Sequence, residues 1–278
     1  MRICALAALL AGCGFEQKPA ASPQPQPAPP PLPRSFTQTV EVFQVAFDMV
    51  LVPGDEAKGI KALYVGKHEV TWDEFMPWVY AGSAEIGDKP AAAVVRKKRL
   101  CPSALPYGDI TRGYGTDRFP ALSMSWLSAD TYCAWLSAET GRSYRVPTNR
   151  EWEHIFRLSR GGAATELSAA DAERLAVFEV NSFDDENGDY QTRRVGSMDP
   201  DHLGLYDLSG NVAEWVSETG DVHVVRGGHF RSPLEELGVR GWLVEDQAIW
   251  NMNYPNEPKN RCWYVDAKWV GFRLVCEP

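Results

Sequence analysis

The chain has 278 residues, 20 of them proline, and a formal net charge of −9. An acidic protein of this kind is not expected to bind nucleic acid, which attracts basic surfaces. Residues 36–278 suffice for one large domain or two small ones, and they contain neither a second linker nor an internal repeat. We therefore expect a single domain preceded by two short N-terminal segments.

The first residues have the pattern of an export signal. A lone positive charge precedes the apolar run Ile3–Leu10, which is too short to span a bilayer because a membrane helix takes about 20 apolar residues. The sequence Leu-Ala-Gly-Cys at Leu10–Cys13 resembles the lipobox of bacterial lipoproteins; an ordinary signal peptide with an incidental cysteine is the alternative. The resemblance implies that residues 1–12 are removed and that acyl chains on Cys13 anchor the protein to a membrane. Gly14 differs from the aspartate linked to inner-membrane retention, which favours a cell-envelope location at the outer membrane or periplasmic face.

The segment 13–35 has the composition of a tether. Eight prolines lie within Glu16–Arg34, and almost no residue there is apolar. Since proline removes backbone donors and fixes φ, this stretch is not expected to pack. We expect a semi-rigid spacer of ~3.1 Å per residue between the lipid and the domain. A partner-binding proline motif is the alternative.

The first part of the domain contains two predicted strands and one predicted helix. A strand-like run at Met49–Val52 is stopped by Pro-Gly, and a second run covers Ala62–Val65. Thr71 and Glu74 have the spacing of a capping box, which predicts an amphipathic helix to about Tyr80.

An irregular stretch follows at residues 84–119, where glycine and proline recur. Its basic run Arg96–Arg99 is expected to be a solvated loop, with contact to a phosphate or a lipid headgroup as the alternative.

Two further helices are predicted after this stretch. The first covers about Ala129–Glu139, with Ser128 as its cap, and ends at Gly141 because glycine accepts the left-handed conformation. The second begins at a capping box formed by Thr148 and Glu151. It runs to about Arg160, after a short strand at Tyr144–Pro147. Beyond Gly162 the pattern indicates loops, turns and short strands.

The cysteines and histidines give no local signature of a metal site. No two cysteines of the domain have the CxxC spacing of a zinc site, and the histidines form no HxxxH or HxH pair. Outside the cytoplasm the cysteines can form disulfides, and four of them allow three connectivities, among which the sequence does not choose. The four are Cys101, Cys133, Cys262 and Cys276.

A series of motifs follows in one order along the domain. The longest is Gly-Leu-Tyr-Asp-Leu-Ser-Gly-Asn-Val-Ala-Glu-Trp at Gly204–Trp215, and the others are Pro120–Trp126, Tyr132–Leu136, Tyr144–Thr148, Glu151–Glu153, Val195–Ser197, Val225–Gly228 and Gly271–Leu274. The set resembles the formylglycine-generating enzyme (sulfatase-modifying factor) family over nearly all of residues 43–275. The resemblance implies an α+β domain with the irregular C-type-lectin-like fold, in which two or three helices pack on a twisted sheet.

The longest motif also predicts a calcium site. Gly210, Val212 and Glu214 alternate with a period of two, so their oxygen groups can face one way in an extended segment. With Asp207 nearby, they form a cluster of hard oxygen ligands suited to structural calcium. In the family the matching positions bind calcium. The alternative is a turn with a buried, hydrogen-bonded Glu214.

A second calcium site is implied by the resemblance alone. The acidic run 184–189 does not fit an EF-hand, because a loop with Gly188 at its sixth position has Arg194 at its twelfth. The family has another site in this region, however. Its first ligands match the side chain of Asn181 and the carbonyl of Ser182. Asn187 and the carbonyl of Asp189 fall near the remaining ligands, in an alignment that can shift by one residue. The alternative is a solvated acidic loop.

The sequence departs from the family at the catalytic centre. Formylglycine-generating enzymes bind copper with two cysteines five residues apart, because soft thiolates hold Cu(I). The matching positions here are Ser232 and Leu237, and His229 replaces a serine. We therefore expect neither copper nor formylglycine formation, and assign no catalytic residue.

A binding cleft is expected where the copper centre lies in the family. Its predicted residues are Arg226, His229, Phe230 and Ser232. The segment Gly241–Asp266 is longer than in the family, and we expect its Trp242 and Trp250 to form a rim. Buried packing of these two tryptophans is the alternative. The resemblance also implies a disulfide between Cys133 and a C-terminal cysteine, Cys262 or Cys276.

Three functions are compatible with this pattern. The first is a non-catalytic module of the cell envelope that binds a partner protein, a peptide or a glycan. The second is a different oxidoreductase, as in family members of pyoverdine maturation, with His229 and Glu235, Glu236 or Asp246 as metal ligands. The third, a true formylglycine generator, is disfavoured by the missing cysteines.

Overall fold

The computed structural model describes residues 31–83, 101, 109, 111–162, 166–220 and 222–278. The predicted signal peptide, Cys13 and the run Arg96–Arg99 lie outside these residues. Residues 33–278 form one compact unit. No helix among the described residues is long and apolar enough to cross a membrane.

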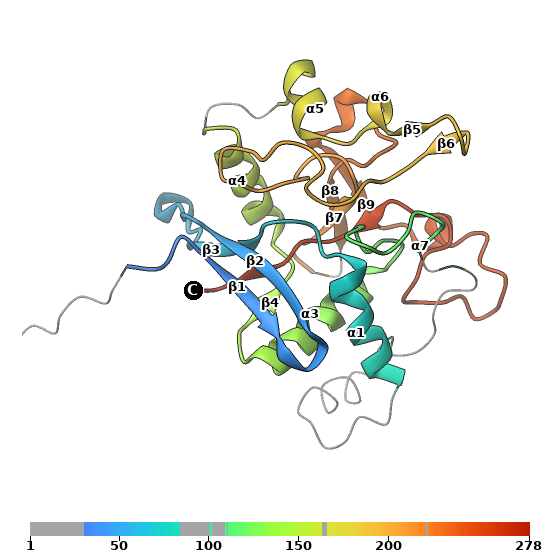
Figure 1. Cartoon of the computed structure of the whole chain (residues 1–278), viewed down its shortest axis with the longest axis horizontal. Helices are drawn as coiled ribbons and strands as arrows, with labels where there is room; N and C mark the ends of the chain where they lie inside the picture. Colours follow the sequence, from blue (N-terminus) through green and yellow to red (C-terminus); the bar gives the residue numbers. More distant parts are fainter. Residues whose placement is uncertain (1–30, 84–100, 102–108, 110, 163–165, 221) are drawn as a thin grey trace, which may run out of the picture. The chain divides into compact units, whose positions relative to one another are not determined.

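The first sheet joins the two ends of the domain (Figure 1). It has five antiparallel strands in the order β1-β2-β3-β11-β4. The helices α1 (Trp72–Ser83) and α3 (Trp126–Thr140) pack beside it and contact each other. The strands are β1 (Ser35–Val40), β2 (Val45–Val52), β3 (Leu63–Gly66), β4 (Tyr144–Arg145) and β11 (Val275–Cys276).

The second sheet carries the longest family motif. Its order is β10-β7-β8-β9, with β10 parallel to β7 and the other pairs antiparallel. Its strands are β7 (Ala213–Ser217), β8 (His223–Gly227), β9 (Gly238–Val244) and β10 (Val270–Gly271). The remaining elements are α4 (Asn149–Ser159), α5 (Ala169–Leu175), α6 (Glu179–Ser182), α7 (Gln247–Trp250) and the hairpin of β5 (Phe183–Asp184) and β6 (Asp189–Tyr190), with short 3-10 turns at Glu41–Phe43, Glu56–Lys58 and Leu234–Glu236.

Aromatic side chains dominate the core. One cluster lies around α1 and α3 and includes Trp72, Trp135 and Trp215, whereas the other surrounds Trp152 and Phe156 of α4. Large flat rings fill the irregular spaces that short strands and long loops leave. The α+β class predicted from the sequence is confirmed.

The local helix signals were largely correct. Thr148 and Glu151 form the predicted reciprocal capping box of α4, and Gly141 ends α3 with a φ of 73°. The predicted cap Ser128 is wrong: α3 begins three residues earlier, and the Ser125 hydroxyl accepts the Ser128 N–H at 3.4 Å. The Ser128 hydroxyl donates instead to the Cys262 carbonyl at 2.7 Å. This contact with a distant segment of the chain replaces the predicted capping role of Ser128.

The predicted disulfide partner was also wrong. Cys262 pairs with Cys101, with Cα atoms 5.4 Å apart, whereas Cys133 and Cys276 are buried thiols outside any disulfide. Cys133 lies on the face of α3 that enters the aromatic core, and there it packs as a small apolar side chain.

Candidate functional site

A buried ion pair lies at the centre of the domain. Glu214 on β7 and Arg273, just before β11, are each 1% exposed. The guanidinium donates to Glu214 Oε1 from Nη2 at 2.6 Å and from Nε at 2.9 Å. Trp152 Nε1 donates to Glu214 Oε2 at 2.9 Å. Both oxygens of Glu214 therefore have partners within the protein.

Two more carboxyl groups lie close to this pair. Glu69 accepts hydrogen bonds from Asn211 Nδ2 at 2.6 Å and from the Val212 N–H at 2.9 Å. Burial raises the pKa of Glu69 well above its usual range, and the negative charges of Asp207 and Glu214 raise it further. The positive charge of Arg273 opposes this effect.

Asp207 is the third buried carboxyl group near Arg273, and one of its two oxygens has no hydrogen-bond partner in the described structure. Its Oδ2 accepts the Gly196 N–H at 2.7 Å, while Oδ1 is buried without a hydrogen-bond partner in the described structure. Burial raises the pKa of Asp207 to about 6. An orphaned buried oxygen is costly unless a proton, a water molecule or a cation satisfies it.

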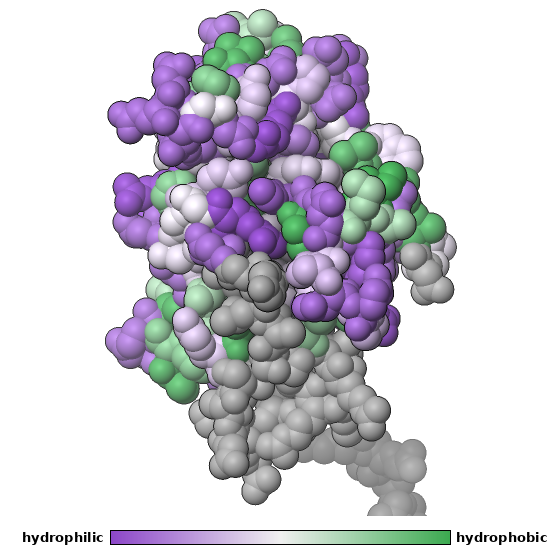
Figure 2. All heavy atoms as spheres, turned by 90° about the vertical axis from the view of Figure 1, so that its right-hand side faces the viewer, coloured by the Kyte–Doolittle hydropathy of each residue, from purple (hydrophilic) through white to green (hydrophobic). Residues whose placement is uncertain are grey.

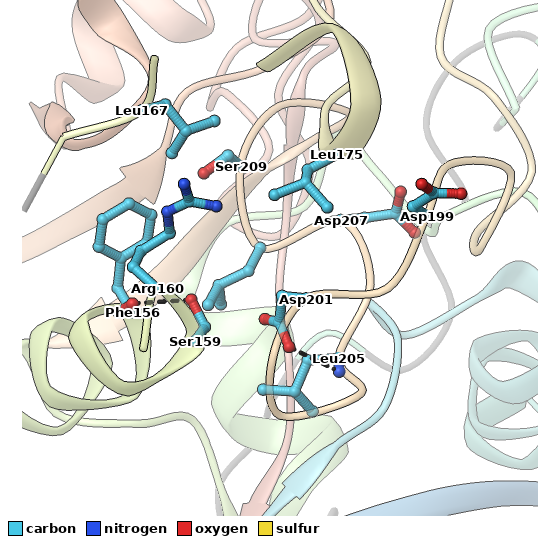
Figure 3. A pocket seen from close by; sticks show the side chains of 11 residues that line it. Phe156, Ser159, Arg160, Leu167, Leu175, Asp199, Asp201, Leu205, Asp207 and Ser209 are labelled. Carbon is cyan, nitrogen blue, oxygen red and sulfur yellow. Dashed lines mark hydrogen bonds between the residues drawn. The ribbon is translucent and has the colours of Figure 1, made fainter. Parts of the chain in front are cut away.

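A small cavity lined by both polar and apolar side chains adjoins Asp207 (Figure 3). Its volume of about 20 Å³ is enough for one water molecule or one small ion. Asp201 and Arg160 also line it, and each has a buried atom without a partner, Oδ2 and Nε respectively. Figure 3 shows Asp201 turned toward Leu205, whose N–H donates to its other oxygen at 3.0 Å.

A second cavity, which we call the His229 cavity, lies where β8 leads into the following turn. It has a volume of about 120 Å³ and is lined by Gly228, His229, Ser232, Glu236, Arg240 and Trp242, among others. His229 stacks on Trp269 with ring centroids 4.5 Å apart. Burial lowers the pKa of His229 to about 3, and its Nδ1 accepts the Arg231 N–H at 3.1 Å. The ring is therefore neutral and carries its proton on Nε2.

Two of the four residues predicted for the binding cleft line this cavity. They are His229 and Ser232. Phe230 is fully buried and packs edge-on against Tyr114, so its apolar ring belongs to the core. Arg226 is also buried, and its guanidinium donates to Asn149 Oδ1 at 2.6 Å and to the Val239 carbonyl at 2.9 Å.

The predicted aromatic rim consists of one tryptophan rather than two. Trp242 on β9 is 51% exposed and lines the His229 cavity. Trp250 on α7 is 7% exposed, because its ring packs against Trp215 and Tyr264. The prediction of an exposed rim at Trp250 is therefore wrong.

Comparison with known proteins identifies the family. Residues 35–278 match the Sulfatase-modifying factor enzyme 1-like domain. The chain belongs to this family. The family match therefore covers nearly the whole described domain.

Several proteins with different names are similar to this chain in sequence. The chain is 25% identical over 222 residues to "Chaperone protein LppX" of Paenibacillus barcinonensis, covering 63% of this chain and 72% of that protein. It is 32% identical over 122 residues to "Inactive C-alpha-formylglycine-generating enzyme 2" of Mus musculus, covering 39% of this chain and 36% of that protein. It is 29% identical over 153 residues to the formylglycine-generating enzyme of Streptomyces coelicolor, covering 44% of each. The chain thus spans less than half of the last two proteins.

Solved structures confirm the fold. Treponema denticola variable protein 1 aligns with a TM-score of 0.58 at 19% identity, covering 89% of this chain and all of that one. PvdO from Pseudomonas aeruginosa aligns with a TM-score of 0.53 at 21% identity, covering 88% of this chain and 91% of that one. The family fold predicted from the motifs is therefore confirmed.

The two positions predicted to match the copper cysteines, Ser232 and Leu237, have other roles in this sulfatase-modifying factor domain. Ser232 is 2% exposed, and its hydroxyl accepts the His229 N–H at 3.1 Å, which closes the turn. Leu237 is 3% exposed and packs in the core cluster around Phe156. A hydroxyl engaged in a turn and a buried hydrocarbon offer no soft ligand for copper.

The predicted calcium site at the long motif is only partly compatible with this geometry. Glu214 faces Arg273 and Trp152, as in the alternative of a buried, hydrogen-bonded carboxylate. Gly210 lies in a turn against Val177, where a Cβ atom would approach the Val177 carbonyl oxygen to 2.2 Å. Among the described residues no group of three or more His, Cys, Asp or Glu side chains is placed to hold a metal. The unpartnered oxygen of Asp207 fits a calcium ligand, so calcium there stays a prediction.

Residues predicted for the second calcium site make hydrogen bonds within the protein. Asn181 caps a turn, with Oδ1 accepting the Phe178 N–H at 3.0 Å. Asn187 donates to Asp184 at 2.6 Å. The group predicted at Asp189 is its carbonyl, whereas its carboxylate accepts from Arg231 at 2.7 Å. The Ser182 carbonyl accepts the Gln191 N–H at 2.8 Å. These contacts describe a hydrogen-bonded acidic hairpin, and calcium binding by it stays a prediction.

Proposed function

We propose that this sulfatase-modifying factor domain is a non-catalytic interaction module, exported and held to a membrane of the cell envelope by lipid on Cys13. The observation that carries the proposal is the placement of Ser232 and Leu237. One residue closes a turn through its hydroxyl and the other fills the core. Neither position provides a soft ligand, so this protein lacks the copper site on which the family's chemistry depends.

The His229 cavity supports a binding role. Its lining combines an exposed aromatic face, Trp242, with a carboxylate at Glu236 and a guanidinium at Arg240. A partly exposed aromatic ring beside a few polar groups is a common composition for recognition of a protein segment. The relative named as a chaperone protein is matched over 63% of this chain, a larger share than either formylglycine-generating relative named above. A peptide segment of an envelope protein is therefore the partner that we favour.

An oxidoreductase with another metal is the competing function. It would require His229 as a ligand together with Glu235, Glu236 or Asp246. The Nδ1 atom of His229 already accepts a backbone N–H, and the ring is stacked on Trp269. Nε2 then carries the ring proton and has no lone pair for a metal, which favours the binding function over a metal centre.

Catalysis is tested with a sulfatase-motif peptide. The protein is incubated with copper, oxygen and the peptide, whose mass is then measured, with the Streptomyces coelicolor formylglycine-generating enzyme as the positive control. We expect no mass change with this protein. Formylglycine at turnover stoichiometry would overturn the non-catalytic proposal, whereas copper binding alone would not.

Binding is tested in cells by photo-crosslinking. A photoreactive residue in place of Glu236, at the cavity, should capture an envelope protein. The same residue in place of Val42, exposed in the turn between β1 and β2, is the matched control. Equal capture at both positions would contradict a specific role for the His229 cavity.

The lipid anchor is tested separately by mass spectrometry of the N-terminal peptide. We expect a mature protein that starts with an acylated Cys13. Retention of residues 1–12, or an unmodified Cys13 in the membrane fraction, would reject the anchor without affecting the assignment of the cavity.

A further inference from the structure

A third cavity, which we call the α4 cavity, lies between α4 and the connection from β2 to β3 (Figure 1). Its volume is about 430 Å³. Three apolar side chains line it: Ile60 and Phe156 are 8% and 1% exposed, and Val239 of β9 is partly buried. The cavity therefore offers a ligand apolar contact area in addition to polar groups.

Three positively charged side chains also line the α4 cavity, those of Lys58, Arg150 and Arg157. Charged and polar side chains as such are common on this protein, and Figure 2 shows hydrophilic residues over much of the face that it draws. The three cations differ because they share one sign and surround one cavity, in a chain with a net charge of −9. A cationic cavity on an acidic protein favours a negatively charged ligand.

Uncharged acceptors hold the two guanidinium groups of the cavity in place. Arg150 Nη2 donates to the Lys58 carbonyl at 2.8 Å, which connects α4 to the turn after β2. His154 is 5% exposed and donates from Nε2 to the Pro53 carbonyl at 2.9 Å, so its Nδ1 accepts from Arg157 Nη2 at 2.8 Å. These hydrogen bonds orient the guanidinium groups without neutralising their charge.

One carboxylate serves two of the three cations. Asp55 contacts Lys58 at 3.0 Å and Arg157 at 3.6 Å. Among the described residues, no carboxylate forms an ion pair with Arg150. The three cations and Asp55 together therefore leave two positive charges unbalanced.

The other carboxylate of the cavity already has a partner. Glu153 lines the cavity, but its carboxylate pairs with Arg226 at 2.5 Å. Glu218 lies within electrostatic reach of Arg226 as well, and it lines a neighbouring cavity that shares only Ile60 and Arg150 with this one. The charge of Glu153 is therefore balanced within the protein and does not oppose an anion at the three cations.

We propose that the α4 cavity binds the doubly charged group of a phosphate monoester through its three cations. Such a group carries about −1.5 to −2 charges at neutral pH, which matches the two unbalanced positive charges. A guanidinium donates two parallel hydrogen bonds to phosphate oxygens, and a lysine adds a compact charge. The organic part of the ester contacts Ile60 and Phe156. This site is separate from the His229 cavity, and the interaction module proposed above does not depend on it.

Calorimetric titration of the full-length protein with phenyl phosphate tests the site. We expect phenyl phosphate to bind more tightly than inorganic phosphate, which has no apolar part, and than phenyl sulfate, which has a single charge. Arg150→Gln and Lys58→Gln should each weaken binding at least about tenfold, because each removes a charge-assisted hydrogen bond. Arg194→Gln changes an exposed arginine that does not line the cavity, so it is the matched control and should bind like the unmodified protein.

A soluble ester and the headgroup of a lipid both present a phosphate monoester, and a second titration distinguishes these sources. It uses a short-chain phosphatidic acid, with the corresponding phosphatidylcholine, whose headgroup has no net charge, as the control. Tighter binding of the phosphatidic acid than of phenyl phosphate would identify a lipid headgroup as the ligand, and the reverse order would identify a soluble ester.

Three results would overturn the site. They are no binding of either phosphate monoester, equal affinity for phenyl phosphate and phenyl sulfate, and binding that is unchanged in both Arg150→Gln and Lys58→Gln. Unchanged melting temperatures would verify that the two variants are folded, and the exposed side chain of Lys58 makes a folded variant at that position the expected result.

Discussion

The buried arginine at the centre of the domain provides the sharpest test of what holds this fold together. Arg273 donates to Glu214 and to two backbone carbonyls, those of Gly66 at 2.9 Å and Tyr206 at 2.8 Å. In Arg273→Met the apolar volume is nearly kept while the charge and these donors are lost. Glu214 is then left buried beside Glu69 without a counter-charge.

The expected cost follows from the burial of the pair. Removing one partner of a buried ion pair costs about 3–5 kcal/mol, out of a total stability of about 5–15 kcal/mol for a typical domain. The exposed pair of Arg194 with Asp117, with side chains 58% and 76% exposed, is the matched control. Arg194→Met should cost less than about 1 kcal/mol. The difference between the two variants therefore isolates the effect of burial.

Urea unfolding monitored by tryptophan fluorescence measures both costs, because Trp152 is hydrogen-bonded to Glu214. The double variant Arg273→Met with Glu214→Gln should be more stable than Arg273→Met alone, since it no longer buries an unpaired charge. Lowering the pH should also stabilise Arg273→Met relative to the unmodified protein, because protonation removes uncompensated negative charge. If Arg273→Met costs no more than Arg194→Met, the carboxyl groups do not depend on the arginine and the reasoning fails.

Three further predictions concern titration, the disulfide and calcium. Burial raises the pKa of Glu74 to about 7, so the folded state holds a proton there that the unfolded state has released. The free energy of unfolding should therefore fall between about pH 5 and about pH 8, and Glu74→Gln should reduce that slope in urea titrations; an unchanged slope would contradict the assignment. The disulfide of Cys101 and Cys262 links residues 161 apart, so a double serine variant should lose about 5 kcal/mol in the loop-entropy model, and peptide mapping that shows either cysteine unlinked would refute the pairing. If calcium binds at Asp207, chelator should lower the melting temperature and Asp207→Ala should abolish that response; no response, together with no calcium in elemental analysis, would reject the site.

The sequence alone was sufficient to predict features that depend on residues close together in the chain, such as helix ends and motifs. The capping box at Thr148 and the glycine at Gly141 fixed the ends of two helices, since each acts within one helical turn. The order of the motifs was sufficient to predict the family and the α+β fold, because each motif has its own turn and packing pattern. The match of Ser232 and Leu237 to the family's copper cysteines is also an inference from the sequence, and it stays a prediction.

Tertiary structure decided which distant groups meet. The partner of Glu214 is an arginine 59 residues away, and Glu69 contacts Asn211 across 142 residues. No local spacing carries this information, so the sequence suggested Glu214 as a calcium ligand, whereas the fold pairs this carboxylate with a guanidinium. Calcium at Asp207 stays a prediction. The motif Gly271–Leu274 contained the signal, but the charge of Arg273 is informative only once this residue is known to be buried.

The same limit explains the errors in the disulfide and at the rim of the His229 cavity. Cys133 and Cys101 differ in what surrounds them rather than in their spacing, and only the core reveals that α3 buries Cys133. Trp242 and Trp250 lie eight positions apart in one inserted segment, yet the first is on an open sheet edge and the second faces Trp215. Residue type determines what a side chain can do, whereas burial by distant segments decides whether it is available to do it.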